Sequence, residues 1–232
     1  EGDEWNPFAG LDVDAQELQV FLNQVPFAQG PDRRRHAAKV PVPESLPCPK
    51  SDKPISTQEA FGRILYDIAG QDGDFAHRIV TTSPDVTVST NLGGWVNRRG
   101  IFDRHRREDI FREEKVVSAQ RWAMHPDGQH VELGIAENNL FLTLAALGLS
   151  YSLFGERLLP VGTLYDPFVN RGLDALNYAC YQDARFMLIG TPSGITLAPE
   201  GGAHQSIGTP LIGLAQDGLS AFEPTFVDEL TE

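Results

Sequence analysis

The sequence predicts an α/β fold, in which a parallel β-sheet carries helices on both of its faces. Short apolar stretches of strand length alternate with longer stretches of helical pattern through most of the chain. This alternation implies right-handed crossovers, which make the strands parallel and place helices on both sides of the sheet. Residues 140–149 are apolar except for Thr143 and Gly148, which predicts a buried helix at the centre of the fold.

Composition limits the size and the partners of this fold. The 232 residues are 41% hydrophobic and 22% charged, which is ordinary for a globular α/β protein and allows one sizeable core plus an extension. The net charge is −13. Nucleic acid is therefore not expected as the main partner, because phosphate binding needs clustered Lys and Arg.

Three further features indicate the setting of the chain. Cys48 and Cys180 lie far apart, with neither CxxC nor metal-site spacing, which fits a reducing compartment; we expect the cytoplasm. No signal peptide or membrane-spanning stretch is visible, so no membrane partner is expected. The chain begins with EGDEW rather than with Met, and we expect it to be a piece of a longer polypeptide.

Residues 1–54 are predicted to form an arm or interdomain linker, and residues 55–228 a compact domain. Within the arm, residues 14–25 have the amphipathic pattern of a short docking helix. Five prolines between positions 41 and 54 forbid a regular helix and favour an extended segment on a protein surface.

The compact domain is predicted to begin with a helix and a strand. Ser56 and Glu59 have the spacing of a capping box, and the apolar residues after them recur at helical spacing. After a Gly-rich turn, residues 78–86 predict the first strand. Asp85 then lies near the carboxyl end of this strand, where α/β sheets bind ligands. An Asx turn after Pro84 is the structural alternative for this residue.

Two polar segments follow. Residues 98–115 mix seven basic with five acidic side chains, which is typical of a solvated surface. Attraction of an anionic substrate by Arg98 or Arg99 is the alternative role for this segment. His125 and His130 flank a turn without a third ligand nearby, so neither zinc nor another metal site is expected.

The central stretch places one acid at a junction between a strand and a helix. Residues 131–135 alternate like a short strand, and Glu137 follows at the start of the apolar helix. This helix is too short to span a membrane, so we expect the sheet and a partner subunit or domain to cover it. A buried carboxylate is costly without a partner or a chemical role, although the helix dipole also favours an acid at this position.

The alternation continues beyond this helix. Strands are predicted at 158–165 and 186–192, with helices at 166–184 and about 204–214.

Several side chains with chemical potential follow directly after these strands. They are Glu137, Tyr165, Phe168 and His204. Because parallel strands bring their carboxyl ends to one edge, this acid, these two aromatic rings and this histidine form a candidate site for a flat heterocycle. For His204, a loop histidine that caps backbone carbonyls is the alternative.

Four segments resemble one family. SPDVTVSTNL (83–92), GIAEN (134–138), YDPF (165–168) and GGAHQS (201–206) are similar, in order and spacing, to segments of one domain of thiamine-diphosphate enzymes. This is the pyrimidine-binding domain of the transketolase and pyruvate dehydrogenase branch. The Pro-rich arm and its lead into STQEAF look most like the decarboxylating first component of bacterial homodimeric pyruvate dehydrogenase complexes.

The resemblance implies roles for five residues. Glu137 would bind the aminopyrimidine ring nitrogen of thiamine diphosphate and so help the cofactor lose its thiazolium proton. Phe168, with Tyr165 beside it, would stack on the pyrimidine. His204 would lie near the substrate carbonyl as a hydrogen-bond donor or proton shuttle. Asp85 would be a further cofactor contact.

The resemblance also implies partners. In this family a separate domain binds the diphosphate and Mg²⁺ through a GDG motif followed by Asn, and the sequence contains no GDG. We therefore expect a diphosphate-binding domain or subunit as partner, a homodimer in the complete protein, and no turnover by this chain alone.

Three readings of the function stay open at this stage. The first is a 2-oxo acid dehydrogenase of pyruvate type, acting on a small 2-oxo acid; the second is a transketolase that moves two-carbon ketol units between sugar phosphates. The third is a non-catalytic assembly module. A dinucleotide-binding enzyme is not expected, because no GxGxxG follows the first strand.

Overall fold

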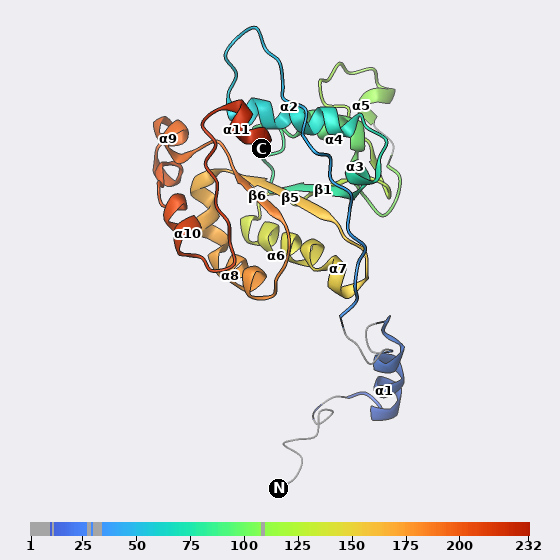
Figure 1. Cartoon of the computed structure of the whole chain (residues 1–232). Coiled ribbons are helices and arrows are strands. Elements are labelled where there is room, and N and C mark those ends of the chain that lie inside the picture. Colours follow the sequence, from blue (N-terminus) through green and yellow to red (C-terminus); the bar gives the residue numbers. More distant parts are fainter. Residues whose placement is uncertain (1–9, 11, 27–28, 30–33, 108–109) are drawn as a thin grey trace.

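Parallel strands form one sheet in the computed structural model, which describes residues 10, 12–26, 29, 34–107 and 110–232. The strands of this described part are β1 (Ile79–Ser83), β2 (Ile101–Phe102), β3 (Met124–His125), β4 (His130–Glu132), β5 (Leu159–Leu164) and β6 (Met187–Gly190). Their order is β3-β2-β4-β1-β5-β6, and all of these neighbours pair in parallel (Figure 1). The predicted fold class is confirmed.

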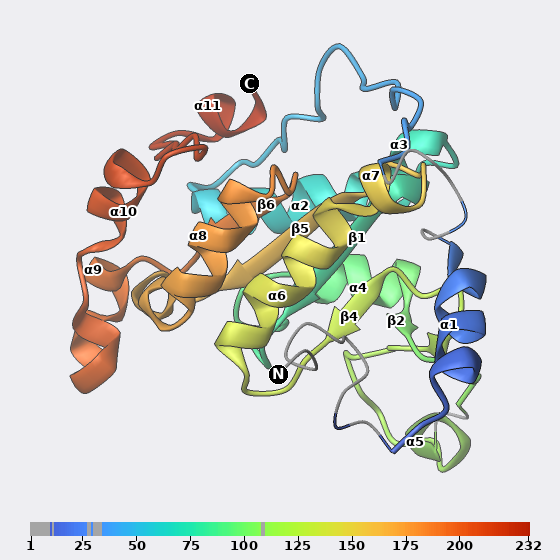
Figure 2. The ribbon, with the colours of Figure 1, turned by 90° about the horizontal axis from the view of Figure 1, so that it is seen from below.

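Helices cover both faces of the sheet, as predicted. One face carries α2 (Thr57–Ala69) and α4 (Gly93–Arg99), and the other carries α6 (Glu137–Gly148) and α8 (Leu173–Tyr181). Figure 2 views the molecule from the side of α6 and α8, which lie in front of the central strands. The shorter helices are α3 (Asp74–Arg78), α5 (Ile110–Glu113), α7 (Ser150–Leu153), α9 (Gly194–Leu197), α10 (Thr209–Ala215), α11 (Val227–Thr231) and the 3₁₀ turns η2 (Asp166–Gly172), η3 (Ala198–Glu200) and η4 (Gly202–Gln205).

The first face of the sheet is closed by α2. The Ser56 hydroxyl accepts a hydrogen bond from the backbone N–H of Glu59 at 3.1 Å, as the capping pattern predicts. The four predicted apolar positions of α2 are buried against β1 and α4; they are Phe61, Ile64, Leu65 and Ile68. Trp95 of α4 is fully buried in the same core.

The second face is closed by α6, which lies close to its neighbours. A side chain at Gly162 of β5 would meet Leu144, and one at Gly172 would overlap the ring of Phe141. These two glycines therefore allow α6 to approach both the sheet and η2. One side of α6 is buried within this chain, whereas Leu142 is 53% exposed; cover of that side by a partner subunit or domain stays a prediction.

Some elements differ from the prediction. The elements α3, α4, β2 and β3 were not predicted. The strands β2 and β3 have two residues each, which is too short to show alternation. The predicted helix 166–184 is divided into η2 and α8 at Gly172. Glycine is a poor helix former, and a larger residue at this position would overlap the Phe141 ring. The predicted helix 204–214 is likewise divided into η4 and α10.

The described part of the arm contains the predicted helix, α1 (Ala15–Gln24). Asp14 caps it by accepting hydrogen bonds from the backbone N–H groups of Gln16 and Glu17, and α1 has no buried residue. Residues 41–54 form neither helix nor strand, as the prolines predict, and Leu46 packs against the core cluster to which α2 contributes. None of the described helices combines the length and the apolar character that crossing a membrane requires.

Candidate functional site

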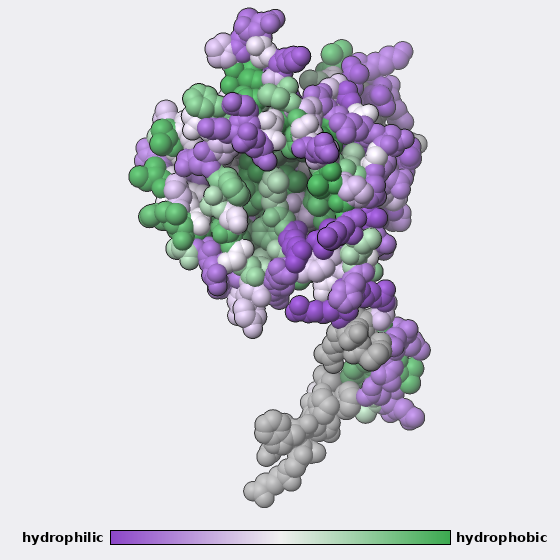
Figure 3. All heavy atoms as spheres, viewed as in Figure 1, coloured by the Kyte–Doolittle hydropathy of each residue, from purple (hydrophilic) through white to green (hydrophobic). Residues whose placement is uncertain are grey.

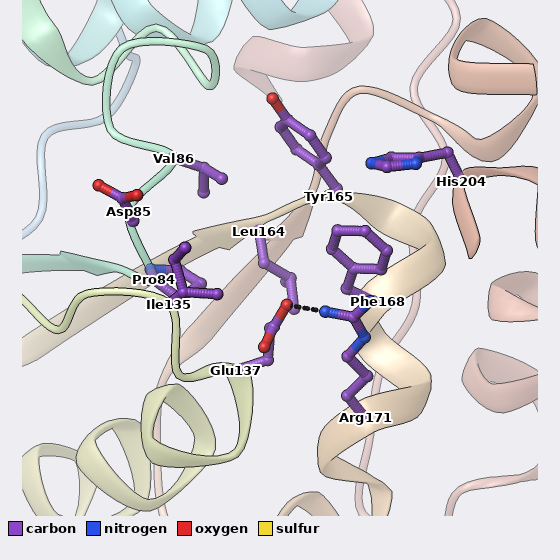
Figure 4. Close-up of a pocket in the computed structure, with 10 residues that line it drawn as sticks. All are labelled: Pro84, Asp85, Val86, Ile135, Glu137, Leu164, Tyr165, Phe168, Arg171 and His204. Carbon is purple, nitrogen blue, oxygen red and sulfur yellow. Dashed lines mark hydrogen bonds and ion pairs between the residues drawn. The ribbon is translucent and has the colours of Figure 1, made fainter. Parts of the chain in front are cut away.

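A pocket of about 250 Å³ lies at the carboxyl ends of β1, β4 and β5, beside the loop that follows β6. We call it the strand-end pocket (Figure 4). Its lining residues are Pro84, Asp85, Val86, Ile135, Glu137, Leu164, Tyr165, Phe168, Arg171 and His204. The structure therefore brings together all five residues that the sequence singled out.

Glu137 is the first residue of α6, where the positive end of the helix dipole favours a carboxylate. Its side chain is only 13% exposed. It forms an ion pair with the guanidinium of Arg171, drawn as a dashed line in Figure 4. This ion pair satisfies a carboxylate that would otherwise be costly to hold in a largely buried position.

Aromatic rings form one wall of the strand-end pocket. The ring centroids of Tyr165 and Phe168 are 5.8 Å apart with planes 26° from parallel, an offset stacked arrangement. The His204 ring is 5.0 Å from Phe168 and 6.1 Å from Tyr165. The guanidinium carbon of Arg171 is 3.8 Å from the centroid of Phe168.

His204 reaches the pocket from η4. Its Nε2 is 3.6 Å from the carboxylate of Glu200, four residues earlier in the chain, and its backbone N–H donates to the carbonyl of Gly201. Figure 4 shows the imidazole directed toward the aromatic wall. His204 is thus held on one side by an acid and faces the pocket on the other.

Asp85 occupies the opposite rim. Its backbone has a φ of 63°, a left-handed conformation that Asp tolerates better than most residues. Its backbone N–H donates to Glu132 Oε1 at 2.9 Å. Figure 4 shows its carboxylate pointing away from Glu137 and Arg171, so its backbone, rather than its charge, is the part that is fixed at the pocket.

A buried polar cluster beneath this rim holds it in place; we call it the Glu132 network. It consists of Thr81, Ser83, Thr87, His130, Glu132 and the backbone N–H of Asp85. The Thr87 hydroxyl donates to Glu132 Oε2 at 2.7 Å and lies 2.6 Å from the Ser83 hydroxyl. The fully buried His130 ring lies between Thr81 Oγ1 at 2.8 Å and Thr87 Oγ1 at 3.1 Å.

The network controls the charge of Glu132. Burial on its own would raise the pKa of this carboxyl group, but hydrogen bonds from His130, Thr87 and the backbone of Asp85 outweigh burial and lower the pKa to about 2. Glu132 is therefore ionised at neutral pH and anchors the loop that follows β1.

Three important residues were missed by reasoning from sequence. Arg171 follows Phe168 by three residues, which places both on one side of a helical turn and was the available signal. Glu132 gave no such signal beyond its place in an alternating strand. His130 was considered only as a zinc ligand, whereas the structure places it inside the network.

The residues of the pocket fit one ring of thiamine diphosphate rather than the whole cofactor. A volume of about 250 Å³ is below the range of about 300 to 1,000 Å³ common for drug-sized ligands. A largely buried carboxylate next to an aromatic face suits a planar heterocycle with N–H donors, such as an aminopyrimidine. Among the described residues no group of three His, Cys, Asp or Glu side chains is arranged to hold a metal ion.

Known proteins are similar to this chain in sequence. The chain is 27% identical over 233 residues to a pyruvate dehydrogenase E1 component of Corynebacterium glutamicum, and 28% identical over 208 residues to one of Pseudomonas aeruginosa. These alignments cover 97% and 86% of this chain, but only 25% and 23% of the relatives. The chain thus spans about a quarter of the length of the relatives that it matches.

Solved structures share the fold. Transketolases from Leishmania mexicana and Campylobacter jejuni align with TM-scores of 0.50 at 16% and 17% identity. They cover 77% and 88% of this chain, which in turn covers 21% and 25% of them. Residues 46–231 match the family described as the pyruvate dehydrogenase E1 component middle domain, and the chain belongs to this family.

Proposed function

We propose that this chain is the pyrimidine-binding part of a thiamine-diphosphate-dependent enzyme that decarboxylates a 2-oxo acid, with pyruvate as the first candidate substrate. One observation carries the proposal. Glu137, Phe168 and His204 line one small pocket in a chain that belongs to the middle-domain family of pyruvate dehydrogenase E1 components. Thiamine diphosphate supplies the nucleophilic carbon and the electron sink that such a decarboxylation needs.

The proposal assigns a role to five of the residues that line the pocket. Glu137 accepts a hydrogen bond at the pyrimidine ring nitrogen, and its position inside the pocket strengthens that bond. Phe168 and Tyr165 provide the apolar wall that orients the ring. His204, which faces the same space, donates a hydrogen bond or a proton at the substrate carbonyl. Asp85 closes the opposite rim as a further cofactor contact.

The other half of the cofactor site is proposed to come from a partner. That partner is a diphosphate-binding domain or subunit that carries Mg²⁺, and the assembled enzyme is a cytoplasmic homodimer with residues 1–54 as an arm. The surface of this chain supports an extensive contact. Figure 3 shows hydrophobic side chains on the flank formed by α9 and α10, where Ile195, Leu211 and Leu214 are 79%, 68% and 85% exposed.

Calorimetric titration of thiamine diphosphate with Mg²⁺ tests the proposal directly. We expect no binding to the chain alone, and binding once the diphosphate-binding partner is added. Pyruvate and other small 2-oxo acids are then assayed first, with sugar phosphates as the comparison that would indicate a transketolase. Turnover by the chain alone would contradict the partner requirement, and absence of binding in both states would favour an assembly module.

A further inference from the structure

Arg171 contacts the two groups that are proposed to hold the aminopyrimidine ring. Its guanidinium forms an ion pair with Glu137, and its central carbon is 3.8 Å from the centroid of the Phe168 ring. A guanidinium is planar, donates N–H bonds to carboxylates and stacks on aromatic faces. An aminopyrimidine has the same three properties, so Arg171 makes the contacts that the ring of the cofactor would make.

The Arg171 guanidinium and an aminopyrimidine cannot occupy these contacts at the same time. A separation of 3.8 Å is van der Waals contact, so the face of Phe168 beneath the guanidinium has no space for a second planar group. The Oε1 atom of Glu137 is likewise occupied, because it accepts a hydrogen bond from Arg171 Nη1. Entry of a pyrimidine into this place therefore requires one of the present partners to move.

Arg171 is the partner that can move. Its side chain is 44% exposed, whereas that of Glu137 is 13% exposed. Among the described residues, Arg171 has Glu137 as its hydrogen-bonding partner and Phe168 as its ring contact. When the pyrimidine takes over the contacts with Glu137 and Phe168, this long side chain can turn into solvent at small cost, because the carboxylate keeps a partner and the guanidinium is already partly exposed.

We propose that Arg171 is an internal stand-in for the aminopyrimidine, which holds Glu137 and Phe168 in place and is displaced when thiamine diphosphate binds. The inference rests on the proposed function and adds a residue that competes with the cofactor. The inference predicts the direction in which cofactor affinity changes when Arg171 is removed. Removal of Arg171 strengthens cofactor binding if the side chain must leave, and weakens it if the side chain stays and supports Glu137.

The test compares three variants of the assembled protein, that is, this chain with the partner that supplies the diphosphate site. Arg171→Met removes the charge and the donors, and we expect thiamine diphosphate with Mg²⁺ to bind roughly three- to tenfold more tightly by calorimetry. Arg171→Lys keeps an ion pair but loses the stacking, so a smaller increase is expected. Circular dichroism of each variant confirms folding.

Arg185 offers a matched control outside the strand-end pocket. It pairs with the Asp183 carboxylate at 3.1 Å and lies 5.0 Å from the centroid of the Tyr151 ring, so it has the same two kinds of contact. Arg185→Met should leave cofactor affinity unchanged. Unchanged or weaker binding by Arg171→Met would overturn the inference alone. Absence of binding by the unaltered assembly would overturn the proposed function, and the inference with it.

Discussion

Two carboxylates five residues apart, Glu132 and Glu137, are bound in different ways. Glu132 ends β4 and is held by Thr87, by His130 and by the backbone N–H groups of Asp85 and Leu133. Glu137 begins α6, and in the part of the chain that the structure describes it pairs with Arg171 alone. The first carboxylate is surrounded by donors from the folded chain, and the second has one partner on a long, partly exposed side chain.

The difference indicates which acid is available for chemistry. All of the donors around Glu132 belong to the folded chain, so its hydrogen bonds stabilise the loop that carries Asp85. In the proposed displacement of Arg171, Glu137 exchanges this single partner for a ligand. A low pKa therefore marks the positioning acid here, while the acid that lines the pocket is distinguished by its geometry.

Replacement of Glu137 should have the largest effect, and it should act on activity. Glu137→Ala in the assembled protein is expected to lower turnover of the 2-oxo acid by about 10²- to 10⁴-fold, because the proposed role of the carboxylate is to position and polarise the cofactor ring. The measurement is the steady-state rate, with the melting temperature as control for folding. Turnover close to that of the unaltered protein would remove Glu137 from its proposed role.

The pH dependence of stability should come next. The pKa of Glu132 is lowered from 4.5 to about 2 in the folded chain, so its contribution is complete above about pH 5.5 and is lost as the pH falls toward 2. A shift of this size corresponds to about 3 kcal/mol of unfolding free energy. Urea unfolding of the unaltered chain and of Glu132→Gln between pH 7 and pH 3 isolates this contribution. A difference between the two that stays constant with pH would contradict it.

At neutral pH, Glu132→Gln should destabilise the fold by about 2 kcal/mol, because an amide presents N–H donors to groups that already donate. We expect the loop after β1 to loosen and cofactor binding to weaken as a consequence. Chemical denaturation at pH 7 measures the loss of stability, and hydrogen exchange at Asp85 and Val86 measures the loosening of the loop. If the variant is destabilised but hydrogen exchange in the loop is unchanged, Glu132 does not hold the loop at the pocket.

Thr87→Val should have the smallest effect, about 1 kcal/mol. Thr87 is 2% exposed, and valine fills the same space while removing the hydroxyl that donates to Glu132. The pKa of Glu132 should rise, because one of the bonds that favour its ionised form is lost. Two-dimensional NMR titration of the Glu132 carboxyl group measures this change, and Thr90→Val, at a hydroxyl outside the network, serves as the comparison.

Much of the candidate site could be predicted from sequence. Four of the site residues lie shortly after a strand or in the loop after one: Glu137, Tyr165, Phe168 and His204. Parallel strands place all such positions at one edge of the sheet. Their convergence on a single pocket therefore required only the order of strands and helices. The four family-like segments added the chemical roles, which remain to be tested.

The sequence by itself determined the parallel α/β fold, the capped helix α2 and the position of Glu137 at the start of α6, because these depend on local periodicity and on near neighbours. Only the tertiary structure decided the partners of the two acids. Glu132 meets Thr87 and Asp85 through the pairing of β1 with β4, and Glu137 meets Arg171 across 34 residues. Ion pairs and buried hydrogen bonds between distant segments leave no periodic pattern, because they depend on where the packed sheet and helices bring side chains together.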